Sequence, residues 1–322
     1  MPTNFWGKST TLAWTYQVNF VNMWTNLVNS PFVSQLIYAN GAYVGAAYEA
    51  DGCAVRSTDG VTWTKYFLPW AIYTIGQSIA WNGSIYCIVG IGGHCATSSN
   101  GTTWINQTGL SSVSTQLGVA VTWSGSNFCC LGVGGTCATS TDGVTWTNQP
   151  GFATALGASA GSITQAKIIY ANSTFWAAVY NSTSGDATIL KSSDGVTWTV
   201  AIDSSGAAGG VANIAYYPNS GVVYVLYQNG LLLYYNGTSG GISFSLYSAL
   251  GSGKTYKDMI WDGGKMIVGG IGGLVATSYD VNTWIDQSSA LQATTFGTNN
   301  VLAIASNGTQ TVVGGVYGAT SP

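Results

Sequence analysis

Short apolar runs that alternate with turn residues recur along the chain and predict an all-β protein. In the first full unit, four apolar runs lie between residues 35 and 64, separated by an Asn40-Gly41 pair, a loop at 49–52 and an Asp59-Gly60 pair. Asn-Gly and Asp-Gly pairs between apolar runs are strong hairpin signals, because both central residues of a type I′ turn need positive φ. The unit is therefore predicted to be a four-stranded antiparallel meander.

The same unit repeats along most of the chain, and the most regular part of it is the heptapeptide Ser-Thr-Asp-Gly-Val-Thr-Trp. Copies and variants of the heptapeptide occupy residues 57–63, 98–104, 140–146, 192–198 and 278–284. The units themselves span residues 35–64, 78–107, 118–149, 167–202, 213–248, 257–287 and 301–321. Repeated four-stranded meanders are typical of a β-propeller. Tryptophans at six equivalent positions, with Phe244 filling the gap in the fifth unit, predict seven blades.

The last unit stops before its fourth strand, which predicts that another part of the chain completes it. Residues 21–26 resemble residues 281–286, so this segment is expected to supply the strand and to bring Trp24 beside Ser321. Residues 12–15 are a rival, disfavoured because 22 residues would separate Trp14 from Leu36, against 12 from Trp24. Residues 1–17 are then predicted to be an N-terminal arm, possibly a docking segment, and residues 18–322 a single propeller.

The heptapeptide resembles the Asp box, also called the bacterial neuraminidase repeat. The resemblance implies a turn between the third and outermost strands of each blade, in which the acidic residue accepts main-chain N–H groups and the tryptophan packs beneath. The Asp box occurs in sialidases, other glycoside hydrolases, photosystem assembly factors, sorting receptors and phage tail proteins. The residues to which it gives this structural role are Asp59, Trp63, Asn100, Trp104, Asp142, Trp146, Asp194, Trp198, Asp280 and Trp284.

Composition and charge exclude several classes of function. Only 6% of the residues are charged, the net charge is −3, and glycine alone contributes 44 residues. A chain without a basic patch is not expected to bind nucleic acid. No apolar run is long enough to span a bilayer, and residues 1–8 do not form a signal peptide. Polar, weakly charged β proteins of this kind are typical of virions, so a phage particle is the expected location, with an extracellular one as the alternative.

Candidate catalytic chemistry is sparse. Sialidases hold the carboxylate of their substrate with three arginines, whereas this chain has one, Arg56. Glu49 and Asp51 share a loop and are the one close acidic pair with a glutamate, although solvation of the loop is the favoured explanation for them. The single histidine, His94, makes a zinc site or a Ser-His-Asp triad improbable. No enzyme activity, cofactor or metal is therefore expected.

Six cysteines follow the repeat, and two pairs are candidates for cross-strand partners. Cys87 is expected to face Cys95, and Cys129 or Cys130 to face Cys137. Small buried core residues that stay reduced are one interpretation, since free cysteine is among the most buried residue types. Disulfides within the two hairpins are the alternative.

A binding site is predicted on the face opposite the heptapeptide turns, where linkers between blades and the loops after second strands meet. The linker at 66–73 is unusually aromatic, and Tyr66, Trp70 and Tyr73, with Glu49 and Asp51 nearby, are the candidate ligand contacts. Packing over the central channel or against a neighbouring subunit is the alternative role for Trp70 and Tyr73.

These observations together predict a non-enzymatic virion protein, a component of a phage tail fibre, tail spike or head fibre. Its expected partners are host-surface glycans or other virion proteins, and a homo-oligomer is also compatible with the sequence. Neither nucleic-acid binding nor membrane insertion is expected. The alternatives are a soluble glycan-binding lectin and, less favoured, a glycoside hydrolase.

Overall fold

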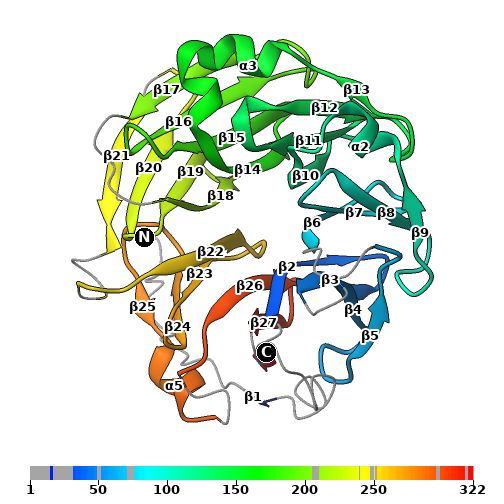
Figure 1. Cartoon of the computed structure of the whole chain (residues 1–322). Coiled ribbons are helices and arrows are strands. Elements are labelled where there is room, and N and C mark those ends of the chain that lie inside the picture. The colour runs from blue at the N-terminus through cyan, green and yellow to red at the C-terminus, as the bar shows by residue number, and fades with distance from the viewer. Residues whose placement is uncertain are drawn as a thin grey trace, which may run out of the picture.

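The computed structural model describes residues 15–16, 32–48, 52–70, 76–204, 210–238, 240–246, 250, 252–294, 298–315 and 318–321. Among these residues, the strands form seven four-stranded antiparallel sheets arranged as a ring (Figure 1). Six of the sheets are built from four consecutive strands each. The prediction of an all-β propeller with four-stranded antiparallel blades is confirmed.

In every sheet the strands run from the central channel outward. The innermost strands are β2 (Phe32–Ala39), β6 (Gly76–Trp81), β10 (Leu117–Trp123), β14 (Ile163–Ala171), β18 (Val211–Tyr217), β22 (Tyr256–Trp261) and β26 (Val301–Ser306). The second strands are β3 (Ala42–Tyr48), β7 (Tyr86–Gly90), β11 (Phe128–Gly132), β15 (Thr174–Asn181), β19 (Val222–Tyr227), β23 (Met266–Gly270) and β27 (Thr311–Gly315).

The two outer layers complete the sheets. The third strands are β4 (Cys53–Ser57), β8 (His94–Ser98), β12 (Cys137–Ser140), β16 (Asp186–Ser192), β20 (Leu231–Tyr235), β24 (Leu274–Ser278) and β28 (Gly318–Ser321). The outermost strands are β5 (Thr64–Phe67), β9 (Ile105–Gln107), β13 (Thr147–Asn148), β17 (Thr199–Ser204), β21 (Gly240–Ser245), β25 (Ile285–Asp286) and β1 (Thr15–Tyr16). Three short helices, α2 (Gly109–Val113), α3 (Gly151–Leu156) and α5 (Ser288–Gln292), lie in linkers between sheets.

The seventh sheet joins both ends of the chain, but through a different segment from the one predicted. Thr15 pairs with Thr320 and Tyr16 with Ala319, so β1 lies antiparallel to β28, and Ser321 pairs with Thr311 on the other side. The prediction that residues 21–26 supply this strand was wrong, and Trp24 lies outside the described residues. Two residues of backbone pairing carry no side-chain signature, so a match to the tryptophan motif was a poor guide.

The core lies between neighbouring sheets. All five residues of β7, β11, β23 and β27 are buried, because each second strand has a sheet packed against both of its faces. One cluster joins Cys129 and Leu131 of one sheet to Phe175 and Leu190 of the next. The apolar runs of these strands are therefore continuous, as expected for strands buried on both faces.

The heptapeptides build one turn five times. In the copy at 140–146, Asp142 Oδ1 accepts hydrogen bonds from the N–H groups of Val144 and Thr145, both at 2.8 Å. Ser140 Oγ donates to the same carboxylate and accepts from Gly143 N–H, at 2.9 and 2.8 Å. Asn100 replaces the carboxylate in the second copy with the same contacts, at 2.9 Å each. The acidic residue therefore caps a turn.

The glycine of each turn supplies the left-handed backbone. Gly143 has a φ of 73°, and a Cβ at that position would meet Thr97 Cγ2 of the preceding sheet at 3.2 Å. The expectation of type I′ geometry for the Asp-Gly pairs was wrong, because Asp142 does not have positive φ. Among the predicted turns within the described residues, Asn40-Gly41 alone has two positive φ values, 51° and 70°. In the weakest copy, buried Val281 adopts a φ of 67°, a strained conformation for a β-branched residue.

In four of the five turns the tryptophan packs on an aromatic residue of its own sheet. Trp146 lies 6.4 Å from Phe128 between ring centroids, and its indole N–H donates to the carbonyl of Gly143 at 3.2 Å. Trp63 and Trp198 make the same carbonyl contact, and Trp284 donates to Val281 at 2.9 Å. The turn and the core beneath it are thus built as one unit.

All six cysteines are reduced and buried. Cys87 Sγ lies 3.6 Å from Cys95 Sγ, and Cys129 Sγ lies 3.7 Å from Cys137 Sγ. The pairs predicted from the repeat are therefore in contact as thiols. Each pair spans a second strand and a third strand of one sheet.

Candidate functional site at the mouth of the central channel

Every innermost strand has an irregularity in its pairing at the same end. The register of β2 shifts between Val33 and Gln35, and the register of β22 shifts between Tyr256 and Asp258, with one unpaired residue in each bulge. Bulges re-aim side chains at the rims of closed sheets. The bulge residues of the seven strands are Ser34, Gln77, Gly118 with Val119, Thr164, Ala212, Lys257 and Leu302.

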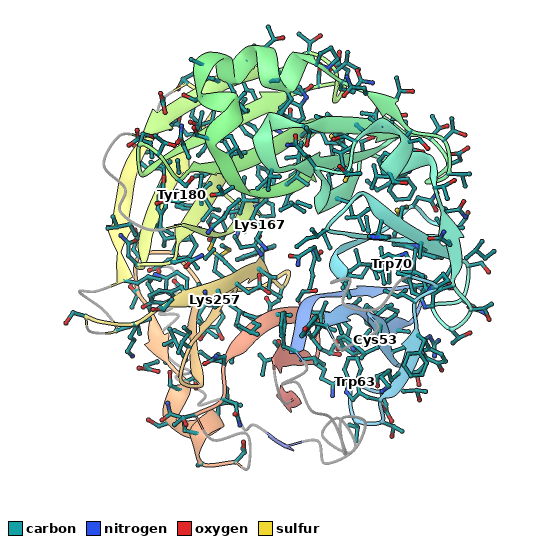
Figure 2. All side chains as sticks on the ribbon, viewed as in Figure 1. Cys53, Trp63, Trp70, Lys167, Tyr180 and Lys257 are labelled. Atoms are coloured by element: carbon teal, nitrogen blue, oxygen red, sulfur yellow. The ribbon has the colours of Figure 1, made fainter. Side chains whose placement is uncertain are left out.

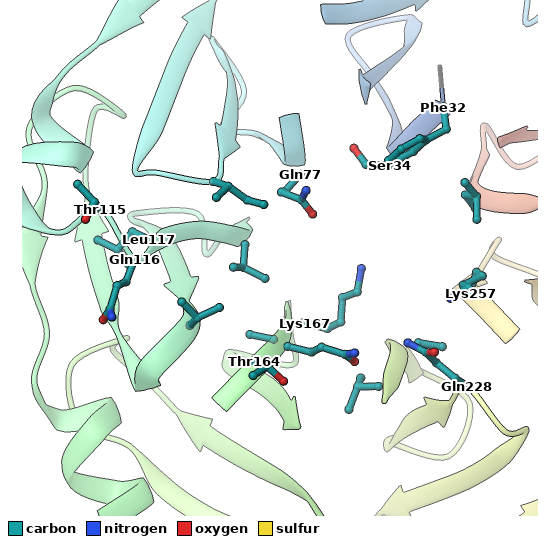
Figure 3. Close-up of a pocket in the computed structure, with 18 residues that line it drawn as sticks. Phe32, Ser34, Gln77, Thr115, Gln116, Leu117, Thr164, Lys167, Gln228 and Lys257 are labelled. Atoms are coloured by element: carbon teal, nitrogen blue, oxygen red, sulfur yellow. The ribbon is translucent and has the colours of Figure 1, made fainter. Parts of the chain in front are cut away.

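These bulge residues surround a cavity of about 440 Å³ at the centre of the ring (Figure 3). One residue from each of the seven bulges lines the cavity. In the β10 bulge this residue is Val119 and not Gly118. Ile91, Val133 and Gln228, from the loops after second strands, complete its mouth. Because the heptapeptide turns join the other ends of the strands, the cavity opens on the face opposite those turns.

The lining of the cavity is mixed. Phe32, Leu117 and Leu302 provide apolar surface, and amide side chains come from Gln77, Gln116, Gln165 and Gln228. The charged side chains that line it are Lys167 and Lys257. A cavity of this size and lining is typical of a small-ligand site.

Lys167 extends from β14 into the cavity (Figure 3). Within the described ranges, neither a hydrogen-bond acceptor nor a carboxylate lies within bonding distance of Lys167 Nζ. Burial lowers the pKa of Lys167, while Asp258 acts to raise it and Lys257 to lower it. The amino group of Lys167 therefore lies in the cavity without a bonded carboxylate among the described residues.

Asp258 lies next to the cavity but is used in the fold. Its Oδ1 accepts from Met259 N–H at 2.8 Å and from the amide of Asn213, and its Oδ2 accepts from Ile304 N–H at 2.6 Å. Burial raises the pKa of Asp258, and Lys167 together with these hydrogen bonds counteracts that rise. The carboxylate thus connects three innermost strands, β18, β22 and β26.

The aromatic site predicted from the linker is separate from this cavity. Trp70 donates from its indole N–H to the carbonyl of Cys95 at 3.4 Å, and its ring lies 5.6 Å from that of His94. Tyr66 and Trp70 both pack partly against the core between two sheets, and neither lines the cavity. Figure 2 shows Trp70 on the same side of the ring as Trp63, away from Lys167. The described contacts of Trp70 are with His94, the carbonyl of Cys95 and the core between two sheets, and its predicted role in ligand binding stays a prediction.

Three of the predicted contacts, Glu49, Asp51 and Tyr73, lie outside the described residues. The cavity residues themselves were not predicted, because a bulge inverts the inward and outward alternation on which strand interpretation rests. A possible signal was polar residues where an innermost strand begins, as at Ser34, Gln77 and Lys257.

The described residues contain neither a metal-binding cluster nor a membrane-spanning helix. Across the described ranges, no three His, Cys, Asp or Glu side chains gather as a metal would require. None of the helices in the described part of the chain is long and apolar enough to cross a membrane.

Comparisons with known proteins show the fold. No protein-family model and no curated protein sequence matches the chain. A structure of YCF48 bound to a D1 peptide is similar over 99% of this chain and 96% of its own, with a TM-score of 0.70 and 12% identity. YCF48 from Cyanidioschyzon merolae is similar over 96% and 98%, with a TM-score of 0.66 and 13% identity.

A more distant likeness has the same architecture. The β-propeller domain of Cps50 (Swd1) from Myceliophthora thermophila matches over 92% of this chain and 97% of its own, with a TM-score of 0.58 and 10% identity. Identities this low establish the fold and not the activity. The chain is a β-propeller of four-stranded antiparallel blades, similar in fold to YCF48.

Proposed function

We propose that this chain is a non-enzymatic binding protein that holds its ligand in the cavity at the mouth of the central channel. The observation that carries the proposal is the ring of bulges, since every innermost strand bends its pairing to turn a residue toward one cavity. Among the described residues, the lining contains no carboxylate, histidine or cysteine side chain, which favours binding over hydrolysis.

We further propose that it acts within a phage particle, as part of a tail fibre, tail spike or head fibre. The supporting feature is composition: 6% charged residues and 44 glycines give a weakly charged, polar β surface. In this proposal the five heptapeptide turns are Asp boxes with a structural role, and the sheet completed by β1 counts as a seventh blade. Mass spectrometry of purified particles tests the location, and repeated failure to detect the chain would contradict it.

The binding site is tested by blocking it. Thr164 is an exposed bulge residue on the cavity wall, so Thr164→Trp is expected to fill the mouth without entering the core. Val144→Trp, in a heptapeptide turn on the opposite face, is the matched control. Wild type and both variants are applied to a glycan array and a peptide array.

Ligands captured by the wild type and by Val144→Trp, but lost with Thr164→Trp, are the expected result. Capture that survives the blocked mouth would place the site elsewhere and overturn the proposal. Hydrolysis of any arrayed glycan would contradict the non-enzymatic role.

Peptides are a second candidate class of ligand beside glycans. The YCF48 structure similar to this chain over nearly its whole length contains a bound D1 peptide. We propose peptide binding as the second candidate, supported here by four glutamine amides that can pair with a peptide backbone. The two arrays distinguish it from a lectin role.

A further inference from the structure

We infer that the cavity recognises a ligand that carries a single carboxylate beside an apolar group, with the amino group of Lys167 as the main contact. This inference rests on the proposed function, because it takes the cavity to be the binding site. It specifies the chemistry of the ligand.

The charge of the site favours an anion. Lys167 and Lys257 line the cavity, and no carboxylate belongs to the part of the lining that the described residues form. Lysine is a compact charge with three donors, and an ammonium group without an acceptor is costly in a partly dry site. A bound anion supplies the acceptor that Lys167 lacks within the described part of the chain.

The number of charges favours a monoanion. Asp258 is the carboxylate next to the cavity, and it offsets one of the two lysines. Its oxygens already accept hydrogen bonds from Asn213, Met259 and Ile304, so it stays in place. One positive charge is then left for a ligand, which matches a carboxylate better than a dianionic phosphate.

The remaining lining indicates the other parts of the ligand. Phe32, Leu117 and Leu302 offer apolar surface to the cavity, and four glutamine amides line it as well. A carboxylate joined to an apolar body therefore fits, and an amide in that body would find partners. Both the carboxyl end of a peptide and a free aliphatic acid have this chemistry.

Isothermal titration with small probes tests the inference. N-acetyl-leucine represents a peptide end, octanoate represents a free acid, N-acetyl-leucinamide is the neutral analogue, and inorganic phosphate is the dianion. Millimolar affinity is expected for at least one carboxylate, given the size of the probes. N-acetyl-leucinamide and phosphate are expected to bind about tenfold more weakly or not at all.

Two lysine variants assign the contact. Lys167→Met keeps the length of the side chain and removes its charge, and is expected to weaken carboxylate binding about tenfold or more. Lys65→Met is the control, because Lys65 lies on the outermost strand β5 against Phe67. Should Lys167→Met fail to fold, the comparison of acid and amide on the wild type still decides.

The outcomes separate the two proposals. Equal binding of acid and amide, or undiminished binding by Lys167→Met, overturns the carboxylate inference; if Thr164→Trp still abolishes that binding, the cavity remains the site. No binding of any carboxylate at millimolar concentration also overturns the inference, while the arrays judge the cavity independently. Preference for N-acetyl-leucine over octanoate, or the reverse, supports the inference and identifies the source of the carboxylate.

Discussion

At position 100 of the second heptapeptide turn, an amide oxygen accepts the two N–H groups that a carboxylate accepts in the other copies. The contacts are 2.9 Å for Asn100 and 2.8 Å for Asp142 and Asp194, so the turn requires an acceptor and not a charge. Burial acts to raise the pKa of Asp142, but the N–H groups of Thr145 and Val144 outweigh it and lower the pKa below its usual value.

This equivalence predicts different results for two variants of Asp142. Asp142→Ala removes the acceptor and is expected to lower the stability by about 1 kcal/mol. Asp142→Asn is expected to leave the melting temperature near that of the wild type at pH 7. Because the folded pKa of Asp142 is lowered, its contribution is complete above the unfolded pKa of about 3.9 and is lost as the pH falls further.

Calorimetry between pH 7 and pH 2.5 checks both variants. The drop in melting temperature at acid pH should be smaller in Asp142→Asn than in the wild type. Asp203→Asn, on the outermost strand β17, is the control. An Asp142→Asn protein that is strongly destabilised at pH 7 would show that the charge itself matters.

The buried cysteine thiols are expected to be unreactive in the folded protein. Burial raises the pKa of Cys130, and burial with the neighbouring Cys137 thiol raises that of Cys129. The thiolate is the reactive form, so the native protein is expected to react negligibly with Ellman's reagent at pH 8. Six thiols should titrate after unfolding in guanidinium. Fewer than six would reveal a disulfide, and rapid native reaction would contradict the burial.

Among the elements, β1 pairs through only two residues, yet it has a clear structural role. Its two residues cover the edge of β28, which would otherwise expose unpaired backbone groups. Removal of residues 1–16 is therefore expected to lower the melting temperature by several degrees and to promote self-association.

Light scattering and calorimetry of the shortened chain test this role. Removal of residues 1–13, which leaves β1 in place, is the control. Unchanged stability and a monomeric state after loss of residues 1–16 would show that closure does not depend on β1.

The sequence predicted those elements whose side chains carry the pattern. Repeated turns and apolar runs located the four-stranded units, and the spacing of Cys87 and Cys95 predicted their contact. The closing strand was missed because a pairing of two residues is too short to leave a pattern in the sequence. The cavity was missed because its residues come from bulges, where the alternation of inward and outward residues fails.

At the scale of the whole molecule, polar side chains connect several neighbouring innermost strands, namely β2 with β6, β6 with β10, β18 with β22 and β22 with β26. Gln35 Oε1 accepts from Ile79 N–H at 2.8 Å, and Ser78 Oγ accepts from Val121 N–H at 3.0 Å. Asp258 does the same for Ile304 while also holding Asn213. These bonds tie the sheets together around the channel, where the apolar core is thinnest.

Asp258→Ala would leave the N–H groups of Met259 and Ile304 without this acceptor, whereas the amide of Asn213 keeps its bond to the carbonyl of Met259. The expected loss is about 2–4 kcal/mol, from two buried polar groups without a partner. A broader, less cooperative thermal transition is expected as well, measured by calorimetry. Asp203→Ala serves as the control, and a variant of Asp258 that melts like the wild type would contradict the role.

The bulges also have a consequence for how such a molecule can diversify. A residue that stands outside the ladder can be exchanged without moving the core register, and here each of seven strands contributes such a residue to one cavity. The ring therefore provides a set of positions whose side chains can be substituted while the scaffold stays the same. A library randomised at Ser34, Gln77, Val119, Thr164, Ala212, Lys257 and Leu302 should yield folded proteins with altered ligand preference.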